Sequence, residues 1–359
     1  MLSVLKKPEA RLAGAKRVFV GMSGGVDSSV AAYLLKRDGF DVVGVHLRCW
    51  NRNGCNVADA EDARRVAEKL NIPFYVFDLE EEYKSRVVDY MVKDYARGLT
   101  PNPDVMCNRE IKFGLFLKKA IVMGADYIAT GHYVKLKQTG SNFSLYEAKD
   151  KNKDQSYFLW TLTQNELKYC LFPIGDYLKP DVRELAKKAE LPTANKKDSQ
   201  GLCFVGKVTL KEFLGEHLRP KTGLIIGTDG VVLGEHSGIH LYTVGQRHGI
   251  GFAGGKPYYV SEKNASSNTI VLAEGEDNLA LYKKEAELIS VNLIAGVEET
   301  LSLPILARIR YRQPLAPARI IKNDAYELVF DKPQKFIASG QSAVFYSQDG
   351  RMLGGGVIK

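Results

Sequence analysis

Short apolar runs alternate with longer amphipathic segments over residues 17–132. The apolar runs predict strands at residues 18–21, 42–47, 74–77 and 127–129. Apolar residues at helical spacing between these runs predict helices at residues 29–37, 59–70, 80–97 and 111–123. Strands that alternate with helices form a parallel sheet with helices on its faces. The pattern therefore predicts an α/β fold, in which ligands bind where the strands end.

After residue 133 this alternation stops. A polar stretch at residues 137–153 precedes an apolar segment and two predicted helices, at residues 164–170 and 181–190, which extend the first domain. Dense glycines after residue 206 favour a small β-rich central domain. Runs of β type at residues 307–311, 326–330 and 342–346 predict a C-terminal β-barrel or sandwich. We expect three domains, at residues 1–209, 210–280 and 281–359.

The composition is that of an ordinary globular protein. Of its 359 residues, 45% are hydrophobic and 26% are charged, which excludes a disordered or collagen-like chain. No apolar run reaches the roughly 18–20 residues of a membrane helix, and the start lacks the apolar core of a signal peptide. We expect a cytoplasmic protein without a membrane partner. A disordered arm, an RNA contact and a mitochondrial presequence are alternative interpretations of the basic residues Lys6, Lys7, Arg11, Lys16 and Arg17.

The net charge is modestly positive. Fifty Lys and Arg against 42 Asp and Glu give +8, which suits a polyanionic partner such as nucleic acid. Residues 301–323 contain five basic and no acidic side chains. In a strand, Arg308, Arg310 and Arg312 would share one face, and Ile309 and Tyr311 the other. Such a face could bind RNA phosphates, with Tyr311 stacked on a base, or be an ordinary solvated strand face.

A glycine-rich turn follows the first predicted strand and leads directly into a helix. Gly24 and Gly25 let the backbone approach a ligand, while Ser23, Ser28 and the first helical amides supply hydrogen-bond donors. The string G-x-x-x-x-G-K-[ST] is absent, so no P-loop lysine reaches between β and γ phosphates. The turn predicts a phosphate or pyrophosphate site, with cleavage between the α and β phosphates of a nucleotide.

The cysteines argue against a disulfide scaffold. There are five, an odd number, and none forms C-x-x-C, so we expect reduced thiols and no structural metal site. Cys107 is predicted in a proline-fixed loop near a helix start, and Cys203 lies between two glycines close to lysines, which favours a thiolate at both. On spacing alone, each of these two cysteines could be either a reactive thiol or a small buried hydrophobic residue. Cys170 is expected in the core on a helix, and Cys49 and Cys55 receive no role.

Six strings together carry a resemblance to the tRNA-specific 2-thiouridylases, over about residues 18–356. They are residues 21–28 (GMSGGVDS), 100–114 (TPNPDVMCNREIKFG), 129–133 (ATGHY), 153–159 (KDQSYFL), 198–206 (DSQGLCFVG) and 242–251 (YTVGQRHGIG). The first string resembles the pyrophosphate loop of ATP pyrophosphatase-type enzymes. The resemblance implies an adenine nucleotide alpha-hydrolase-like first domain, a C-terminal β-barrel that binds tRNA, and ATP with Mg²⁺ as cofactors.

The resemblance also implies site residues. It places the nucleophile at Cys107, the persulfide carrier at Cys203 and an aspartate near the target base at Asp104. The implied ATP contacts are Gly21, Met22, Ser23, Gly24, Gly25, Val26, Asp27, Ser28, Leu47 and Gly131. The implied tRNA contacts are Asn102, Pro103, Asp104, His132, Lys153, Asp154, Gln155, Arg310, Tyr311 and Gln341. Taken alone, Asp104 could be a turn or cap residue, and His132 an ordinary polar surface or core residue.

One string departs from the family. Members commonly have Met-Lys-Asn-Trp where this chain has Leu47-Arg48-Cys49-Trp50. Leu47 can still pack against an adenine ring. Cys49 adds a thiol near the expected ATP site.

The family's reaction would use these groups in order. ATP adenylates the 2-oxygen of the wobble uridine of tRNA, the loop holds the departing pyrophosphate, and sulfur from a Cys203 persulfide displaces AMP. Cys107 either frees sulfide or resolves the sulfur bond, and both routes leave a disulfide between Cys107 and Cys203. The implied partners are tRNAs for Lys, Glu and Gln, and a persulfide donor such as a cysteine desulfurase or a sulfur-relay protein.

Two other classes of function stay open on the sequence. One is a pyrophosphate-loop ligase that adenylates a small metabolite, which would not need two loop cysteines. The other is a non-catalytic RNA-binding protein that retains the nucleotide fold.

Overall fold

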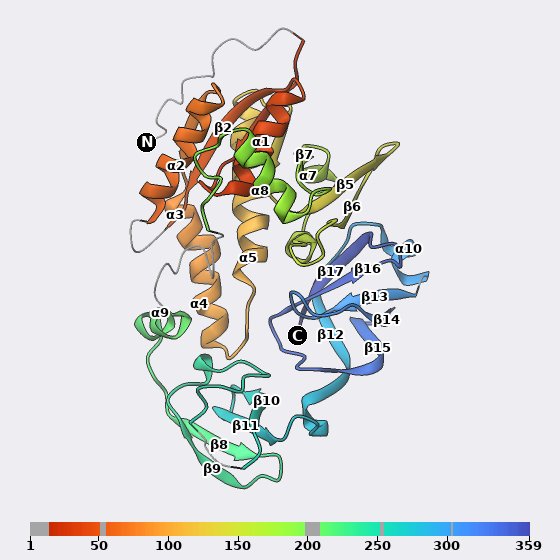
Figure 1. The fold of residues 1–359 in the computed structure, drawn as a ribbon. Helices are drawn as coiled ribbons and strands as arrows, with labels where there is room; N and C mark the ends of the chain where they lie inside the picture. The colour runs from red at the N-terminus through yellow and green to blue at the C-terminus, as the bar shows by residue number, and fades with distance from the viewer. Residues whose placement is uncertain (1–13, 51–54, 198–208, 252–254, 303) are drawn as a thin grey trace. The chain divides into compact units, whose positions relative to one another are not determined.

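The computed structural model describes residues 14–50, 55–197, 209–251, 255–302 and 304–359 (Figure 1). The chain forms two compact units, each built from separate stretches of sequence. The first unit is Met1–Val87, Asp104–Lys207 and Gly350–Met352; the second is Val88–Pro103, Val208–Asp349 and Leu353–Lys359. Each unit thus includes a short stretch remote in sequence from its main part. In the first unit, the amide of Glu147 donates to the carbonyl of Gly350 at 2.9 Å.

A five-stranded parallel sheet forms the centre of the first unit, as the sequence predicts. Its order is β3-β2-β1-β4-β7, with Val20 of β1 opposite Gly44 of β2 and Ala129 of β4. The strands are β1 (Arg17–Gly21), β2 (Asp41–Arg48), β3 (Phe74–Asp78), β4 (Tyr127–Thr130) and β7 (Cys170–Leu171).

Strand alternation directs the sheet's side chains into two helical layers. Val18 and Val20 share a buried core with Val30, Val66 and Val182, which come from α1 (Val26–Arg37), α2 (Cys55–Lys69) and α8 (Lys179–Lys188). Phe19, between those two valines, points to the opposite face. There Phe116 contacts Phe77 edge-on at 6.1 Å between ring centroids. The helical segments on this side include α3 (Glu80–Tyr83), η1 (Lys84–Val88), α5 (Pro103–Met106), the π-helical η2 (Cys107–Phe116) and α6 (Leu117–Val122).

Two local predictions for the first unit are wrong. The helical run expected from residue 111 begins at Pro103, a residue suited to the first turn because its missing N–H has no helical partner there. The helix expected through Cys170 is α7 (Gln164–Leu167), and Cys170 lies in β7, where it pairs with Ile128. The polar stretch contains a hairpin, β5 (Val134–Thr139) and β6 (Asn142–Glu147), followed by η3 (Ser156–Leu159).

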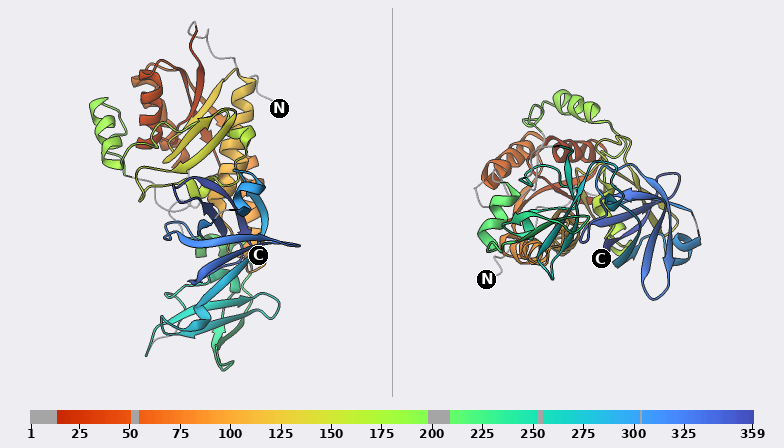
Figure 2. Two further views of the ribbon diagram at one scale, coloured as in Figure 1. Left: turned by 90° about the vertical axis from the view of Figure 1, so that its right-hand side faces the viewer. Right: turned by 90° about the horizontal axis from the view of Figure 1, so that it is seen from below.

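The second unit contains a four-stranded sheet and a closed barrel, with α4 (Asp89–Ala96) and α9 (Leu210–His217). The sheet order is β10-β11-β8-β9, from β8 (Gly223–Gly227), β9 (Val232–His236), β10 (Tyr258–Asn264) and β11 (Thr269–Glu274), with η4 (Ile239–Leu241). The barrel closes in the order β12-β15-β14-β13-β16-β17. Its elements are η5 (Leu279–Leu281), β12 (Tyr282–Leu293), α10 (Val297–Ser302), β13 (Ile305–Arg308), β14 (Ala316–Lys322), β15 (Tyr326–Lys335), β16 (Ser342–Tyr346) and β17 (Met352–Ile358). The barrel strands are the blue arrows in Figures 1 and 2, and they confirm the predicted C-terminal barrel.

The predicted arginine stripe is wrong. Strand β13 ends at Arg308, and Arg312 has a left-handed φ of 63°, so the three arginines do not lie on one strand face. The chain turns here: the amide of Gln313 donates to the carbonyl of Arg310 at 3.2 Å. Arg308 is buried, with its guanidinium 4.7 Å from the ring centroid of Tyr346.

Across the described ranges, no helix combines the length and the apolar character needed to span a membrane.

Candidate functional site

The loop between β1 and α1 is held in a fixed shape by its own serines. The amide of Ser23 donates to Oγ of Ser28 at 3.2 Å, and Oγ of Ser28 donates to the carbonyl of Gly25 at 3.2 Å. Ser29 adds a second hydroxyl on the Gly25 carbonyl at 2.8 Å. These bonds order the turn at the N-terminus of a 12-residue helix, where amide dipoles favour an anion.

Two glycines permit close backbone approach to this loop. Gly24 has φ of 75°, and a Cβ there would lie 2.3 Å from the carbonyl oxygen of Asp59. Gly131 follows β4, and a Cβ there would lie 2.6 Å from the amide nitrogen of Ser28. The end of β4 therefore meets the start of α1 as backbone, and the loop meets α2 in the same way, with no room for a side chain at either glycine.

Asp27, the second residue of α1, has its carboxylate directed at Tyr133 of another string and at Lys179, which lies outside the six strings. Nζ of Lys179 lies 2.7 and 2.8 Å from the two carboxylate oxygens, and the hydroxyl of Tyr133 donates to Oδ1 at 2.8 Å. Lys179 begins α8 and is 8% exposed. Sequence reasoning missed Lys179, because a lysine at a helix start carries no spacing signal.

Leu47 and His46 lie near the end of β2, next to the loop. The amide of Met22 donates to the carbonyl of Val45 at 2.7 Å, and Nδ1 of His46 lies 3.0 Å from the carbonyl oxygen of Met22. Burial lowers the pKa of His46. Leu47 is half-buried at the strand-end position where the sequence predicts an adenine contact.

Cys107 is the first residue of η2 and the fifth of the helical run from Pro103, so it lies in a helix and not in the predicted loop. Its side chain is partly exposed. The same segment packs against the strand ends: a Cβ on Gly21 would be 3.5 Å from the Phe116 ring, and the Phe113 ring lies 5.8 Å from that of His132. Cys107 is therefore carried on an element that contacts the ends of β1 and β4.

Asp104 and His132 both have shifted pKa values. Burial raises the pKa of Asp104, and the positive charge of Lys112 partly offsets this shift. Burial lowers the pKa of His132 well below its usual value, and Lys112 lowers it further. His132 is 6% exposed, and its Nδ1 lies 2.7 Å from Oγ1 of Thr130.

Four of the six family strings meet in the first unit. Two hydrogen bonds connect the strings at residues 129–133 and 153–159. The Tyr133 amide donates to Oε1 of Gln155 at 3.0 Å, and the Gln155 amide donates to the Tyr133 carbonyl at 2.9 Å. Nδ2 of Asn108 donates to the carbonyl of Phe158 at 3.2 Å. The Tyr133 hydroxyl links this group to Asp27 in the loop.

Several predicted tRNA contacts in this unit have their side chains turned inward. Asp154 is 2% exposed, and its carboxylate accepts from the amide of Ala148 and the hydroxyl of Ser156. Gln155 has its amide oxygen occupied by Tyr133, and His132 is buried. Lys153 is half-buried. The predicted tRNA roles of these four residues stay predictions, and only Lys153 combines partial exposure with a positive charge.

The second unit holds the remaining predicted contacts. The guanidinium of Arg310 donates to the carbonyl of Val244, in the string at residues 242–251, and stacks 5.7 Å from the ring centroid of Phe336. Nε2 of Gln341 donates to the carbonyl of Thr100 at 2.8 Å. Asn102 and Tyr311 are half-buried and Pro103 is buried. Gln341 thus holds the segment that leads into α5.

Comparisons with known proteins cover almost the whole chain. Three family models match: the tRNA methyl transferase HUP domain at residues 16–207, the tRNA methyl transferase PRC-barrel domain at residues 211–274 and the aminomethyltransferase beta-barrel domain at residues 283–358. The tRNA-specific 2-thiouridylase MnmA of Geobacillus thermodenitrificans is 44% identical over 350 residues, which are 95% of this chain and 94% of the relative. That of Christiangramia forsetii is 42% identical over 395 residues, covering 96% of this chain and all of the relative.

The chain belongs to the tRNA-specific 2-thiouridylase family.

This membership confirms the resemblance drawn from the six strings, and the matched models confirm the fold class. Solved structures match more distantly. The NMN synthetase of Francisella tularensis aligns at 18% identity and a TM-score of 0.34, over 57% of this chain and 77% of the synthetase. A 4-thiouridine synthetase in complex with RNA and ATP aligns at 20% identity and a TM-score of 0.34, over 53% of this chain and 45% of that one.

The remaining thiols of this thiouridylase-family chain fall into two groups. Cys170 is 2% exposed, and its burial raises the pKa of the thiol, which confirms the predicted core position. Cys49 is partly exposed. Cys203, the predicted persulfide carrier, lies outside the described residues.

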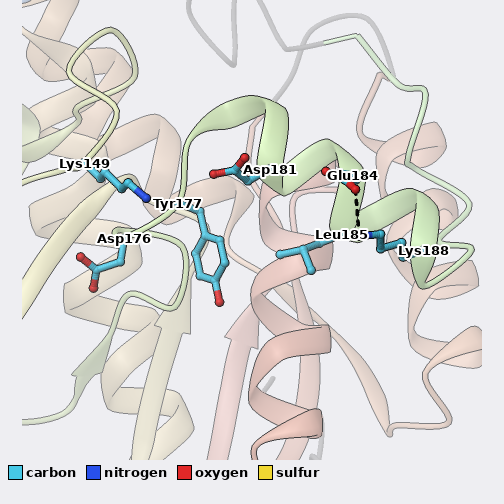
Figure 3. Close-up of a pocket in the computed structure, with 7 residues that line it drawn as sticks. All are labelled: Lys149, Asp176, Tyr177, Asp181, Glu184, Leu185 and Lys188. Atoms are coloured by element: carbon cyan, nitrogen blue, oxygen red, sulfur yellow. Dashed lines mark ion pairs between the residues drawn. The ribbon is translucent and has the colours of Figure 1, made fainter.

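A shallow hollow of about 320 Å³ lies along α8 (Figure 3). Its lining combines two lysines, three acidic side chains and two apolar or aromatic ones: Lys149, Asp176, Tyr177, Asp181, Glu184, Leu185 and Lys188. Glu184 and Lys188 pair with each other at 2.8 Å. None of the residues that the thiouridylase family implies for ATP or tRNA lines it.

Protein ligands for a metal are few. Within the described ranges, no three or more His, Cys, Asp and Glu side chains gather in a way that could hold an ion. The loop's carboxylate, Asp27, has both oxygens on Lys179. These residues do not form a protein-held Mg²⁺ site.

Proposed function

We propose that this chain is an ATP-dependent tRNA-uridine 2-sulfurtransferase that thiolates the wobble uridine of tRNA. The observation that carries the proposal is the meeting of four family strings at the ends of β1 and β4, around the ordered serine–glycine loop. The element that bears Cys107 packs on the same strand ends through Phe116 and Phe113. This packing supports a nucleotide loop and a thiol-bearing helix that act at the same end of the sheet.

The loop would bind the phosphates of ATP. Its outward amides, its serine hydroxyls and the α1 N-terminus are suited to the charge that develops as pyrophosphate leaves. Leu47 would pack on the adenine, and Gly21–Ser28 with Gly131 would contact the phosphates. The 2-oxygen of uracil attacks the α phosphorus, so the base becomes adenylated and pyrophosphate is released. Mg²⁺ would accompany the nucleotide, held by phosphates and water, as this ion commonly is.

Sulfur would arrive as a persulfide on Cys203, loaded by a cysteine desulfurase or a sulfur-relay protein. In one route the terminal sulfur attacks C2 and expels AMP, and the Cys107 thiolate then attacks Sγ of Cys203, which frees the thiouridine. In the other route Cys107 attacks first and releases hydrosulfide, which displaces AMP from C2. Both routes form a Cys107–Cys203 disulfide, and a thiol reductant then restores the two thiols. The disulfide requires Cα atoms within about 7 Å.

Asp104 is proposed to move or orient a proton at the target base. Its raised pKa suits that role, because a base of higher pKa accepts a proton more readily. The tRNA would be held by the residues the family implies in the two units, and acceptors for Lys, Glu and Gln in the cytoplasm are the expected substrates.

The decisive experiment supplies ATP, a persulfide source and unmodified tRNA to the purified chain. Pyrophosphate release and 2-thiouridine at the wobble position, detected by mass spectrometry, are the expected products. Cys107→Ser and Cys203→Ser should each abolish thiolation, whereas Cys49→Ser should retain it. An ATP-dependent reaction that proceeds in both active-site variants without thiolating tRNA would point to a ligase with another nucleophile. RNA binding with no turnover in the parent would point to a binding protein.

A further inference from the structure

The ion pair between Lys179 and Asp27 lies at the proposed nucleotide loop. Asp27 occupies the first turn of α1, and its side chain is 32% exposed, whereas that of Lys179 is 10% exposed. The ammonium contacts both carboxylate oxygens, at 2.7 and 2.8 Å, and Tyr133 donates to one of them. The carboxylate therefore has three polar contacts, two to Lys179 and one to Tyr133.

The position of Asp27 creates an electrostatic conflict for an anion site. A carboxylate in the first turn stabilises a helix through its dipole. The same negative charge repels a polyphosphate bound at the helix N-terminus, and partial burial strengthens that repulsion because solvent screens it less. A cation fixed against the carboxylate removes the conflict.

We propose that Lys179 is the positioning and charge-compensating residue of the nucleotide loop: by neutralising Asp27, it allows α1 to bind pyrophosphate. The inference rests on the proposed function, since it assumes that this loop is the phosphate site. It assigns to a lysine from α8 part of the task that a lysine within the loop performs in P-loop proteins, whose motif this chain lacks.

The surroundings of Lys179 keep its charge in place. The backbone amide of Lys179 donates to Oδ2 of Asp150 at 2.9 Å, and Pro180 follows at the helix start. Val182 and Ala186 of α8 are fully buried in the core that α1 shares. The ammonium also lies 5.8 Å from the ring centroid of Tyr133. Lys179 is thus anchored at its backbone and its ammonium before any ligand arrives.

The test measures binding of inorganic pyrophosphate and of ATP to the full chain by calorimetry, in EDTA, so that metal ligation by Asp27 does not contribute. Lys179→Met should weaken pyrophosphate binding about tenfold, the effect of about 1.4 kcal/mol. Asp27→Asn should bind pyrophosphate more tightly than the parent, because the lysine charge is then unopposed. The double variant Asp27→Asn/Lys179→Met should return to within about threefold of the parent.

Lys188→Met is the matched control, because it removes an exposed lysine paired with Glu184 on the same helix and should leave binding unchanged. The weakening in Lys179→Met should shrink as salt rises, which loss of packing would not do. Parental affinity in Lys179→Met, or a double variant as weak as it, overturns the inference alone. Should Lys179→Met not fold, weaker binding by Asp27→Asn overturns it. A parent that binds neither ligand overturns the nucleotide site and the inference together.

Discussion

Asp104 and His132 share one cationic neighbour and are shifted in opposite directions. Burial disfavours the charged form of each, so the pKa of the carboxyl rises and that of the imidazole falls. Lys112 lowers both pKa values, because a positive charge favours the carboxylate and disfavours the imidazolium. At neutral pH His132 is therefore a neutral side chain next to the thiol-bearing helix.

The pH dependence of thiolation should report Asp104. Its raised pKa places the acid limb of kcat/KM above the usual aspartate range near 3.8, and Lys112→Met should move that limb higher still. Asp104→Asn should lower kcat and remove the limb. A profile measured in single turnover, with sulfur loading complete, isolates this titration. An unchanged acid limb in Asp104→Asn would assign it to another group.

The raised pKa of Asp104 should also make the free energy of unfolding depend on pH. When the pKa of a carboxyl is higher in the folded state, the folded state binds the proton more tightly. The carboxyl's contribution to stability is then fully present below the unfolded-state pKa, and it is lost as the pH rises through the folded-state pKa. The free energy of unfolding of Asp104→Asn, relative to the parent, should therefore increase from pH 4 upward. Urea titrations at several pH values measure this difference. A constant difference would mean that the carboxyl titrates alike in both states.

The thiols should separate by reactivity. Cys170 is buried with a raised pKa, so alkylation of the folded chain should spare it, while Cys107 and Cys49 react. Mass spectrometry of peptides after brief iodoacetamide treatment gives the result, and modification of Cys170 in urea serves as the positive control. Early labelling of Cys170 in the native protein would contradict its core position.

Sequence patterns predicted the anion loop and the burial of Cys170, but not the environment of every polar side chain. The glycine–serine string predicted an ordered anion loop, and the apolar neighbours of Cys170 predicted burial. Nothing in the sequence distinguished Asp154, which is fixed by Ala148 and Ser156, from an exposed contact. Lys179 was equally invisible, because its partner Asp27 lies 152 positions away.

At the scale of elements, the strand–loop–helix junction depends on backbone contact. Gly131 lets the end of β4 touch the first turn of α1, since a Cβ there would lie 2.6 and 2.8 Å from Ser28 N and Asp27 C. This contact fixes the direction of α1 and hence of the amides at its start.

Gly131→Ala should therefore lower the free energy of unfolding by about 1–3 kcal/mol, the usual cost of overpacking, and weaken ATP binding. Gly215→Ala in α9 is the control, because no atom lies within 4 Å of its Cβ position. That substitution should stabilise the chain by about 0.5–1 kcal/mol through helix propensity. Thermal unfolding and calorimetry check both, and a neutral Gly131→Ala would show that β4 and α1 can separate freely.

Helix ends were predicted less well than helix centres. The run from Pro103 was expected from residue 111 because residues 100–109 contain two prolines and several polar residues, a pattern typical of loops. The π-helical turns of η2 further shift the apolar positions from the 3.6-residue period on which the prediction relied. The arginine stripe failed for a related reason, since a turn at Gln313 is not visible in residue spacing.

At the scale of the molecule, the segment that precedes α5 and Cys107 in the chain, Val88–Pro103, belongs to the second unit. The amide of Thr100 donates to the carbonyl of Ser339 at 2.9 Å, and Gln341 donates back to the carbonyl of Thr100. A Cβ on Gly340, whose φ is 90°, would lie 2.9 Å from the Thr100 nitrogen. Residues beside the last barrel strand thereby clamp the segment that enters α5.

Gln341→Ala should lower kcat about fivefold, the effect of the roughly 1 kcal/mol that one hydrogen bond contributes, because residues 100–103 lose a fixed partner. A direct tRNA contact by Gln341 would instead raise KM for tRNA and leave kcat unchanged. Steady-state kinetics with ATP saturating separate the two roles. Gln334→Ala, at a half-buried glutamine of β15, is a suitable control.

The sequence predicts those parts of the architecture that depend on local patterns. The parallel sheet follows from periodicity and turn residues, which also predict a C-terminal barrel or sandwich; the family resemblance favoured the barrel. Local patterns do not predict that residues 88–103 belong to the second unit and Gly350–Met352 to the first. Both assignments depend on contacts between segments hundreds of residues apart.

This exchange of segments constrains how the protein is made. Synthesis proceeds from the amino terminus, yet the first unit includes Gly350–Met352 and the second includes Leu353–Lys359. Neither unit can complete its packing on the ribosome before residues 350–359 have emerged. We expect nascent chains arrested near residue 209 to be protease-sensitive, and the two units to mature together after release rather than one after the other.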